Sequence, residues 1–153
     1  MFKHCIVAAA IVGAAVSNAS AQFVDWRGSA LITAASGCET LGIDPGFVYN
    51  ARYRHPNLGD NGASARISMF ANFHATHLFH PTGDFNNTFQ TVKGVWVAGG
   101  GGTYNASLRM IARTPANITA NTQIVTIKGT VNKFFRTSVS PNCNISFTMT
   151  VMR

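Results

Sequence analysis

Residues 142–153, NCNISFTMTVMR, carry the clearest structural signal in this chain. Apolar side chains recur there at every second position, with polar side chains between them. Successive side chains of a β-strand point to opposite faces, so this alternation predicts a strand with one buried face. The apolar face comprises Ile145, Phe147, Met149 and Val151.

The N-terminal segment has the layout of a secretory signal peptide. Lys3 precedes an unbroken apolar run at 6–16, and the small residues Ala19, Ser20 and Ala21 follow. A basic start, a short apolar run and an A-x-A site are the parts of such a signal, and the run is shorter than the roughly 20 residues of a membrane-spanning helix. We expect cleavage after Ala21, with an uncleaved anchor as the alternative. Residues 22–153 would then form a single exported domain in the periplasm or outside the cell.

Export bears on the cysteines. Without the signal, Cys38 and Cys143 are the two that remain. Two cysteines in an oxidising compartment most often form one disulfide. Cys38 ends the first strong strand candidate and Cys143 lies just inside the last one, so a bond between them would hold the first and last strands close together.

The intervening chain alternates in the same way between turns rich in Gly, Pro and Asn. No stretch has convincing apolar spacing at i, i+3, i+4 and i+7 over the length of a helix. The segment 88–98 alternates less cleanly, which indicates burial on both faces or a bulge at Gly94. We expect seven or eight strands, because 132–139 either extends the strand before it or forms another. The expected segments are 29–38, 47–55, 65–79, 88–98, 103–113, 123–131 and 142–153.

Regular strands joined by such turns form β-sandwiches or small barrels. An up-and-down barrel closes by pairing its first and last strands, and a disulfide needs Cα atoms within about 7 Å of each other. The expected bond therefore suits a closed barrel, although a sandwich can also bring these strands together. The predicted fold is all-β, a single antiparallel barrel or sandwich of seven to eight strands with the first and last strands close together.

Basic residues dominate the charged groups. The chain has 12 Lys and Arg against 5 Asp and Glu, a formal net charge of +7. A hairpin turn at 56–62 would place Arg54 opposite Arg66, with Arg52 on the same face. Like charges that face one another in a ladder cost stability, and Asp60 at the turn tip is the nearest acid in sequence. Arg52, Arg54 and Arg66 are therefore a candidate site for an anionic lipid, an acidic glycan or another polyanion, and no specific nucleic-acid motif accompanies them.

Three histidines form the motif HATHLFH at 74–80. Imidazoles bind zinc and copper, but in a strand His74 and His80 share one face while His77 points away. The three converge only if the backbone bends, as it can next to Pro81. We favour ordinary strand-end histidines, keep His74, His77 and His80 as an alternative metal site, and predict no cofactor.

Enzymatic chemistry finds little support. Most acidic residues fall in expected loops or in the entry segment, no G-x-S-x-G motif occurs, and the cysteines are expected to be oxidised. We predict an exported, non-enzymatic binding or structural module with a basic polar face. The alternatives are a small outer-membrane β-barrel, whose apolar faces would point to lipid, and a histidine-based metal-binding protein.

Overall fold

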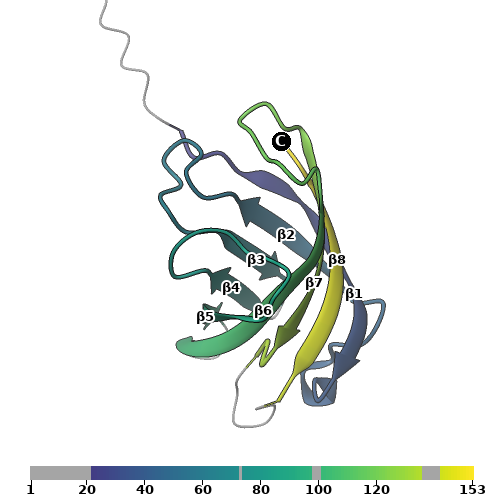
Figure 1. Ribbon diagram of the computed structural model, residues 1–153. Helices are drawn as coiled ribbons and strands as arrows, with labels where there is room; N and C mark the ends of the chain where they lie inside the picture. The colour runs from purple at the N-terminus through teal and green to yellow at the C-terminus, as the bar shows by residue number, and fades with distance from the viewer. Residues whose placement is uncertain (1–21, 73, 98–100, 136–141) are drawn as a thin grey trace, which may run out of the picture.

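The computed structural model describes residues 22–72, 74–97, 101–135 and 142–153, which form a closed antiparallel barrel (Figure 1). Its strands follow one another around the barrel in sequence order, and the last pairs with the first. The all-β prediction with adjacent first and last strands is confirmed, and the structure decides for the barrel over the sandwich. Within these ranges no helix is long and apolar enough to cross a membrane. The elements are β1 (Trp26–Ser36), the 3-10 helix η1 (Glu39–Leu41), β2 (Val48–Arg54), β3 (Arg66–Phe70), β4 (Ala75–Phe79), β5 (Gln90–Val97), β6 (Gly102–Thr114), β7 (Ile124–Asn132) and β8 (Asn144–Met152).

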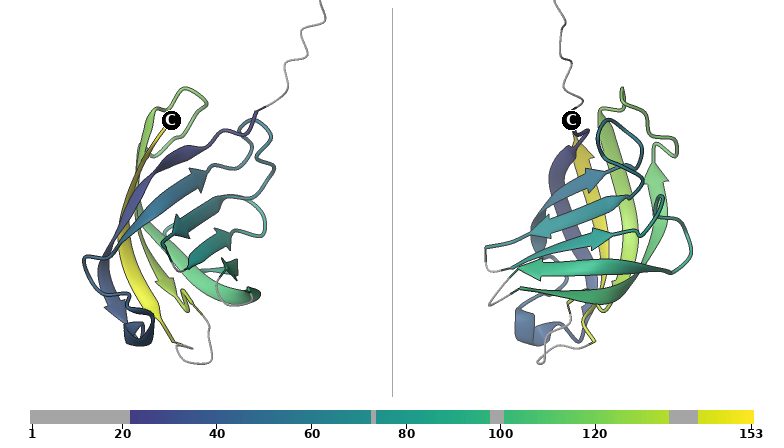
Figure 2. Two further views of the ribbon diagram at one scale, coloured as in Figure 1. Left: turned by 180° about the vertical axis from the view of Figure 1, so that it is seen from behind. Right: turned by 90° about the vertical axis from the view of Figure 1, so that its left-hand side faces the viewer.

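The barrel has two distinct ends (Figure 2). The entry segment before β1 and the C-terminus lie at one end, which we call the terminal end. Helix η1 lies at the other end, beside the disulfide that joins Cys38 to Cys143. The predicted disulfide is thus present, and its Cα atoms are 4.5 Å apart where the β1–β8 ladder finishes. The expected signal peptide at 1–21 lies outside the described residues.

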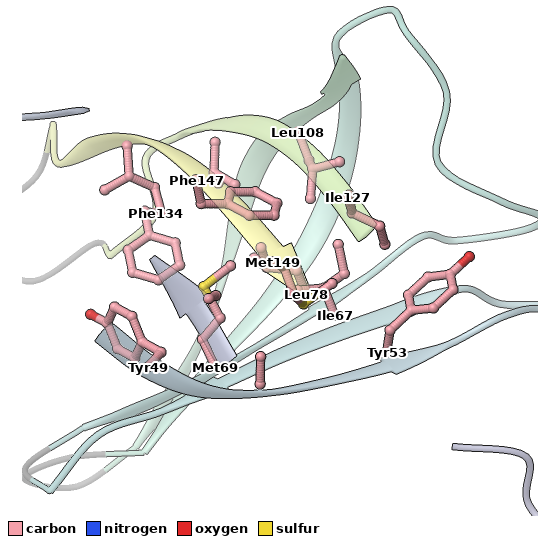
Figure 3. Close-up of a cluster of buried hydrophobic side chains, with 14 of the residues drawn as sticks. Tyr49, Tyr53, Ile67, Met69, Leu78, Leu108, Ile127, Phe134, Phe147 and Met149 are labelled. Atoms are coloured by element: carbon pink, nitrogen blue, oxygen red, sulfur yellow. The ribbon is translucent and has the colours of Figure 1, made fainter. Parts of the chain in front are cut away.

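Apolar side chains fill the barrel. The four alternating apolar residues of β8 are all buried, as the sequence predicts. The outward positions of the strands carry basic residues such as Arg27, Lys93 and Lys128. The outer-membrane alternative requires the opposite orientation, with apolar faces toward lipid and arginines in the lumen. Figure 3 shows buried side chains pointing toward one another inside the barrel, among them Tyr49, Ile67, Leu78, Leu108, Ile127 and Phe147.

Gly94 makes room for an aromatic ring inside the barrel. It lies opposite Tyr104 in the β5–β6 ladder, and a Cβ at this position would be 2.2 Å from the Tyr104 ring. The expectation of a bulge at Gly94, or of a strand buried on both faces, is wrong: the register runs evenly and Val97 is 57% exposed. β5 alternates normally, with the glycine at an inward position.

The segment 65–79 is two strands rather than one. β3 ends at Phe70 and β4 begins at Ala75, and the N–H of Ala71 donates to the carbonyl of His74 at the reversal. The reversal resets the alternation, so Thr76 points inward although the sequence pattern places it on the polar face. Its buried hydroxyl is 2.8 Å from that of Tyr104, which meets the need of a buried polar group for a partner. The strand count of eight comes from this division. The segment 132–139 is the other place where the sequence allows an eighth strand; β7 ends there at Asn132, and 136–141 lie outside the described residues.

Candidate anion-binding site

A basic pocket lies on the outer surface at the terminal end, where β1, β2 and β8 meet the entry segment. Its volume is about 480 Å³. Asp25 is its one acidic lining residue, whereas four arginines line it: Arg27, Arg52, Arg54 and Arg153. We refer to this hollow as the basic pocket.

The arginines face outward because their strand neighbours are needed in the core. Trp26 and Tyr53 are fully buried, so the adjacent positions of β1 and β2 point to solvent. The ladder registers place Arg27 opposite Arg52 and Arg54 opposite Arg66. The second pairing confirms the prediction from the turn at 56–62, and the first adds another like-charge pair on the same surface.

Asp25 offsets part of this repulsion, so the expectation of an uncompensated cluster is wrong. Its carboxylate accepts hydrogen bonds from Nε and Nη2 of Arg54. It also lies 3.6 Å from Nε of Arg52 and 3.9 Å from Nη2 of Arg27. Sequence reasoning missed this acid because it precedes β1 and reaches the arginines of β2 only through the fold. One carboxylate cannot neutralise the three guanidinium groups around it, so the basic pocket keeps a positive charge.

Two aromatic rings hold arginines of the cluster. The Arg54 guanidinium lies 4.4 Å from the ring centre of Phe23, and the Arg66 guanidinium lies 4.2 Å from that of Phe79. Arg66 belongs to the predicted anion site but does not line the basic pocket. Its pKa is lowered by burial and by repulsion from Arg54. The structure therefore shifts the candidate site from Arg66 toward Arg27 and Arg153, while Arg52 and Arg54 remain in it.

A second polar cluster closes the terminal end of the barrel beside the basic pocket. The β6–β7 register shifts between Met110 and Ala112, which turns Arg113 inward, opposite the buried Ile127. Without this shift, strict alternation along β6 would place Arg113 on the outer face with Arg109.

Asp84 is the acceptor at the centre of this second cluster. It accepts hydrogen bonds from Arg113 and from the hydroxyl of Tyr53 at 3.1 Å, and it lies 3.3 Å from Nε2 of His55. Burial lowers the pKa of Arg113, but the hydrogen bond to Asp84 and the interaction with Tyr53 outweigh it, so the net shift is upward. Burial, followed by the charge of Asp84, raises the pKa of Tyr53. These groups are engaged with one another, which suits a structural closure of the barrel end.

The structure separates the three histidines of 74–80. His74 precedes β4 and shares a 2.6 Å hydrogen bond with the Tyr49 hydroxyl. His77 faces outward in β4, 2.8 Å from the Ser68 hydroxyl, and His80 follows β4 beside Gln90. An extended chain of this length spans about 20 Å from His74 to His80. In the described part of the chain, no group of three His, Cys, Asp or Glu residues is placed to hold a metal ion.

Comparisons with known protein families, with curated proteins and with solved structures find no match. The functional argument therefore rests on the basic pocket and its chemistry.

Proposed function

We propose that this protein is an exported, non-enzymatic binding module that holds an anionic ligand in the basic pocket. The observation that carries the proposal is the gathering of four arginines around a pocket of about 480 Å³ with Asp25 as its one acid. Guanidinium groups stay charged at any physiological pH and bind carboxylates, sulfates and phosphates through paired hydrogen bonds. The net charge of +7 adds long-range attraction for the same ligands.

The arginines of the basic pocket differ in how exposed their side chains are. Arg54 is fixed between Asp25 and the ring of Phe23, and its side chain is 16% exposed. Arg27 and Arg52 are more open, at 71% and 35% exposure. We therefore assign ligand contact to Arg27 and Arg52, while the ion pair of Arg54 and Asp25 forms the side of the pocket next to them.

Export is supported by the disulfide and by the signal-peptide pattern at 1–21. Disulfides persist in oxidising compartments and are rare in the cytosol. The proposed location is the periplasm or the extracellular space, where the basic pocket would meet acidic glycans and anionic lipid headgroups.

The test is binding of residues 22–153 to heparin and to anionic vesicles, for the parent and for Arg27→Gln/Arg52→Gln. Charge-assisted hydrogen bonds contribute about 1.5–3 kcal/mol each, so losing two guanidinium groups should weaken binding by about 100-fold or more. The matched control is Lys93→Gln/Arg109→Gln, which removes the same charge from β5 and β6, away from the pocket. The proposal is wrong if the parent binds neither probe, or if both double variants lose binding equally.

A further inference from the structure

Three large apolar side chains are exposed around the basic pocket. Phe23 and Met152 line it and are 53% and 57% exposed. Ile124, the first residue of β7, pairs with Met152 in the β7–β8 ladder and is 56% exposed. Met152 in turn lies opposite Arg27 in the β1–β8 ladder. Scattered exposed apolar residues need no explanation, but these three adjoin one cluster of guanidinium groups.

A small soluble anion would use only half of this surface. It would pair with Arg27 and Arg52 and leave the apolar side chains in water. An anionic phospholipid carries its phosphate directly above its acyl chains, so one ligand satisfies both kinds of side chain. Basic residues are drawn to anionic leaflets, and apolar residues beside them enter the boundary between headgroups and acyl chains.

We propose that the anion in the basic pocket is the phosphate of an anionic phospholipid, and that the barrel rests on a bilayer surface by its terminal end. Phe23, Ile124 and Met152 enter the headgroup–acyl boundary, while Arg27 and Arg52 contact phosphates. This inference rests on the proposed anion-binding function and names its ligand class. The end that carries the disulfide points away from the bilayer.

The acidic groups at the terminal end leave this surface cationic. Asp25 is 10% exposed and already faces three arginines, and Asp84 is engaged by Arg113. Asp60 is exposed in the turn between β2 and β3. These acids face an excess of guanidinium groups, so attraction to a negatively charged leaflet remains.

The first experiment separates charge from apolar contact. Vesicle sedimentation compares phosphatidylcholine alone with phosphatidylcholine that contains phosphatidylglycerol. At about 1 kcal/mol per arginine, Arg27→Gln/Arg52→Gln should reduce partition into the anionic vesicles by about 30-fold. Ile124→Thr/Met152→Thr keeps every charge and should reduce the same partition about threefold or more, with heparin binding unchanged.

The matched control for the apolar variant is Leu31→Thr/Val48→Thr. This pair is also opposed across a ladder, is 43% and 57% exposed, and lies outside the basic pocket. Its partition should equal that of the parent. Equal partition of both threonine pairs would overturn the insertion of Ile124 and Met152.

A second experiment measures how deeply Phe23 enters the bilayer. Phe23→Trp keeps an aromatic ring beside Arg54 and adds an exposed indole at the terminal end. Of the two native tryptophans, Trp26 is fully buried and the half-buried Trp96 lies at the opposite end of the barrel, opposite Thr76 in the β4–β5 ladder. Brominated acyl chains in phosphatidylglycerol vesicles should quench the introduced indole and leave the fluorescence of the parent nearly unchanged. Vesicle binding without this quenching would show attachment by charge alone and would overturn the proposal.

The outcomes also separate this inference from the proposed function. Binding to heparin or inorganic phosphate without binding to anionic vesicles would keep the anion-binding function and overturn the lipid assignment. Absence of binding to all of these probes would overturn both.

Discussion

Removing the disulfide between Cys38 and Cys143 is expected to cost the barrel a large part of its stability. The bond closes a loop over a sequence separation of 105 residues. In the chain-entropy treatment, closing a loop of this length lowers the entropy of the unfolded chain by an amount worth about 4.8 kcal/mol at 25 °C. The free energy of unfolding of an ordinary domain is about 5–15 kcal/mol, so this single crosslink contributes a large share of it.

The folded state itself should change little, because the β1–β8 ladder holds the same two strands together without the bond. Its backbone pairing extends from Arg27 opposite Met152 to Ser36 opposite Asn144. Both cysteines are buried, at 1% and 0% exposure, so alanine is a better replacement than serine, whose hydroxyl would need a partner there. We expect Cys38→Ala/Cys143→Ala to lower the free energy of unfolding by about 3–5 kcal/mol.

The measurement is urea denaturation followed by tryptophan fluorescence, since Trp26 is fully buried in the folded barrel. The oxidised parent, the parent with a reducing agent and the double alanine variant are compared. The reduced parent and the variant should both unfold at lower urea, and the oxidised protein should be lighter than the reduced one by the mass of two hydrogen atoms. Two free thiols on the native protein, or equal urea midpoints for the oxidised parent and the variant, would refute the reasoning.

Four further predictions test the interior and the histidines. Asp84→Asn should lower the free energy of unfolding, measured by urea denaturation, by about 2–4 kcal/mol, because Arg113 keeps its charge without a carboxylate partner. Additive effects of Asp84→Asn and Arg113→Met in a double-variant cycle would contradict an interaction between these two residues. Gly94→Ala should cost about 1–3 kcal/mol because its Cβ would meet a tyrosine ring; an unchanged urea midpoint would count against the packing described. Burial lowers the pKa of His74 in the folded state, so the unfolded state binds more protons as the pH falls through about 6.5. The free energy of unfolding should therefore decline in this range, and it should decline less in His74→Gln. Identical pH profiles for the parent and His74→Gln would contradict this prediction. The parent should also bind zinc no better than His74→Ala/His77→Ala, and stoichiometric zinc lost in that variant would reveal a metal site after all.

Local pattern was enough to predict several parts of this barrel. The alternation of 142–153 identifies β8 and its buried face, because side-chain direction in a strand depends only on position along it. The turn at 56–62 likewise sets Arg54 against Arg66, since residues equidistant from a hairpin turn pair with one another. The signal-peptide pattern and the count of two remaining cysteines were enough to predict the disulfide.

The tertiary structure decided the features that depend on distant segments. The reversal that divides 65–79 is not visible as a break in the alternation, and the bulge that turns Arg113 inward is marked only by the consecutive apolar residues 110–112. Asp25 meets Arg54 because β1 pairs with β2, and Met152 meets Arg27 because the closure of the barrel pairs β8 with β1. Periodicity records which face of a strand is buried, whereas pairing partners follow from the closure of the whole sheet. The basic pocket is made of the entry segment, β1, β2 and the end of β8, so it exists only after that closure.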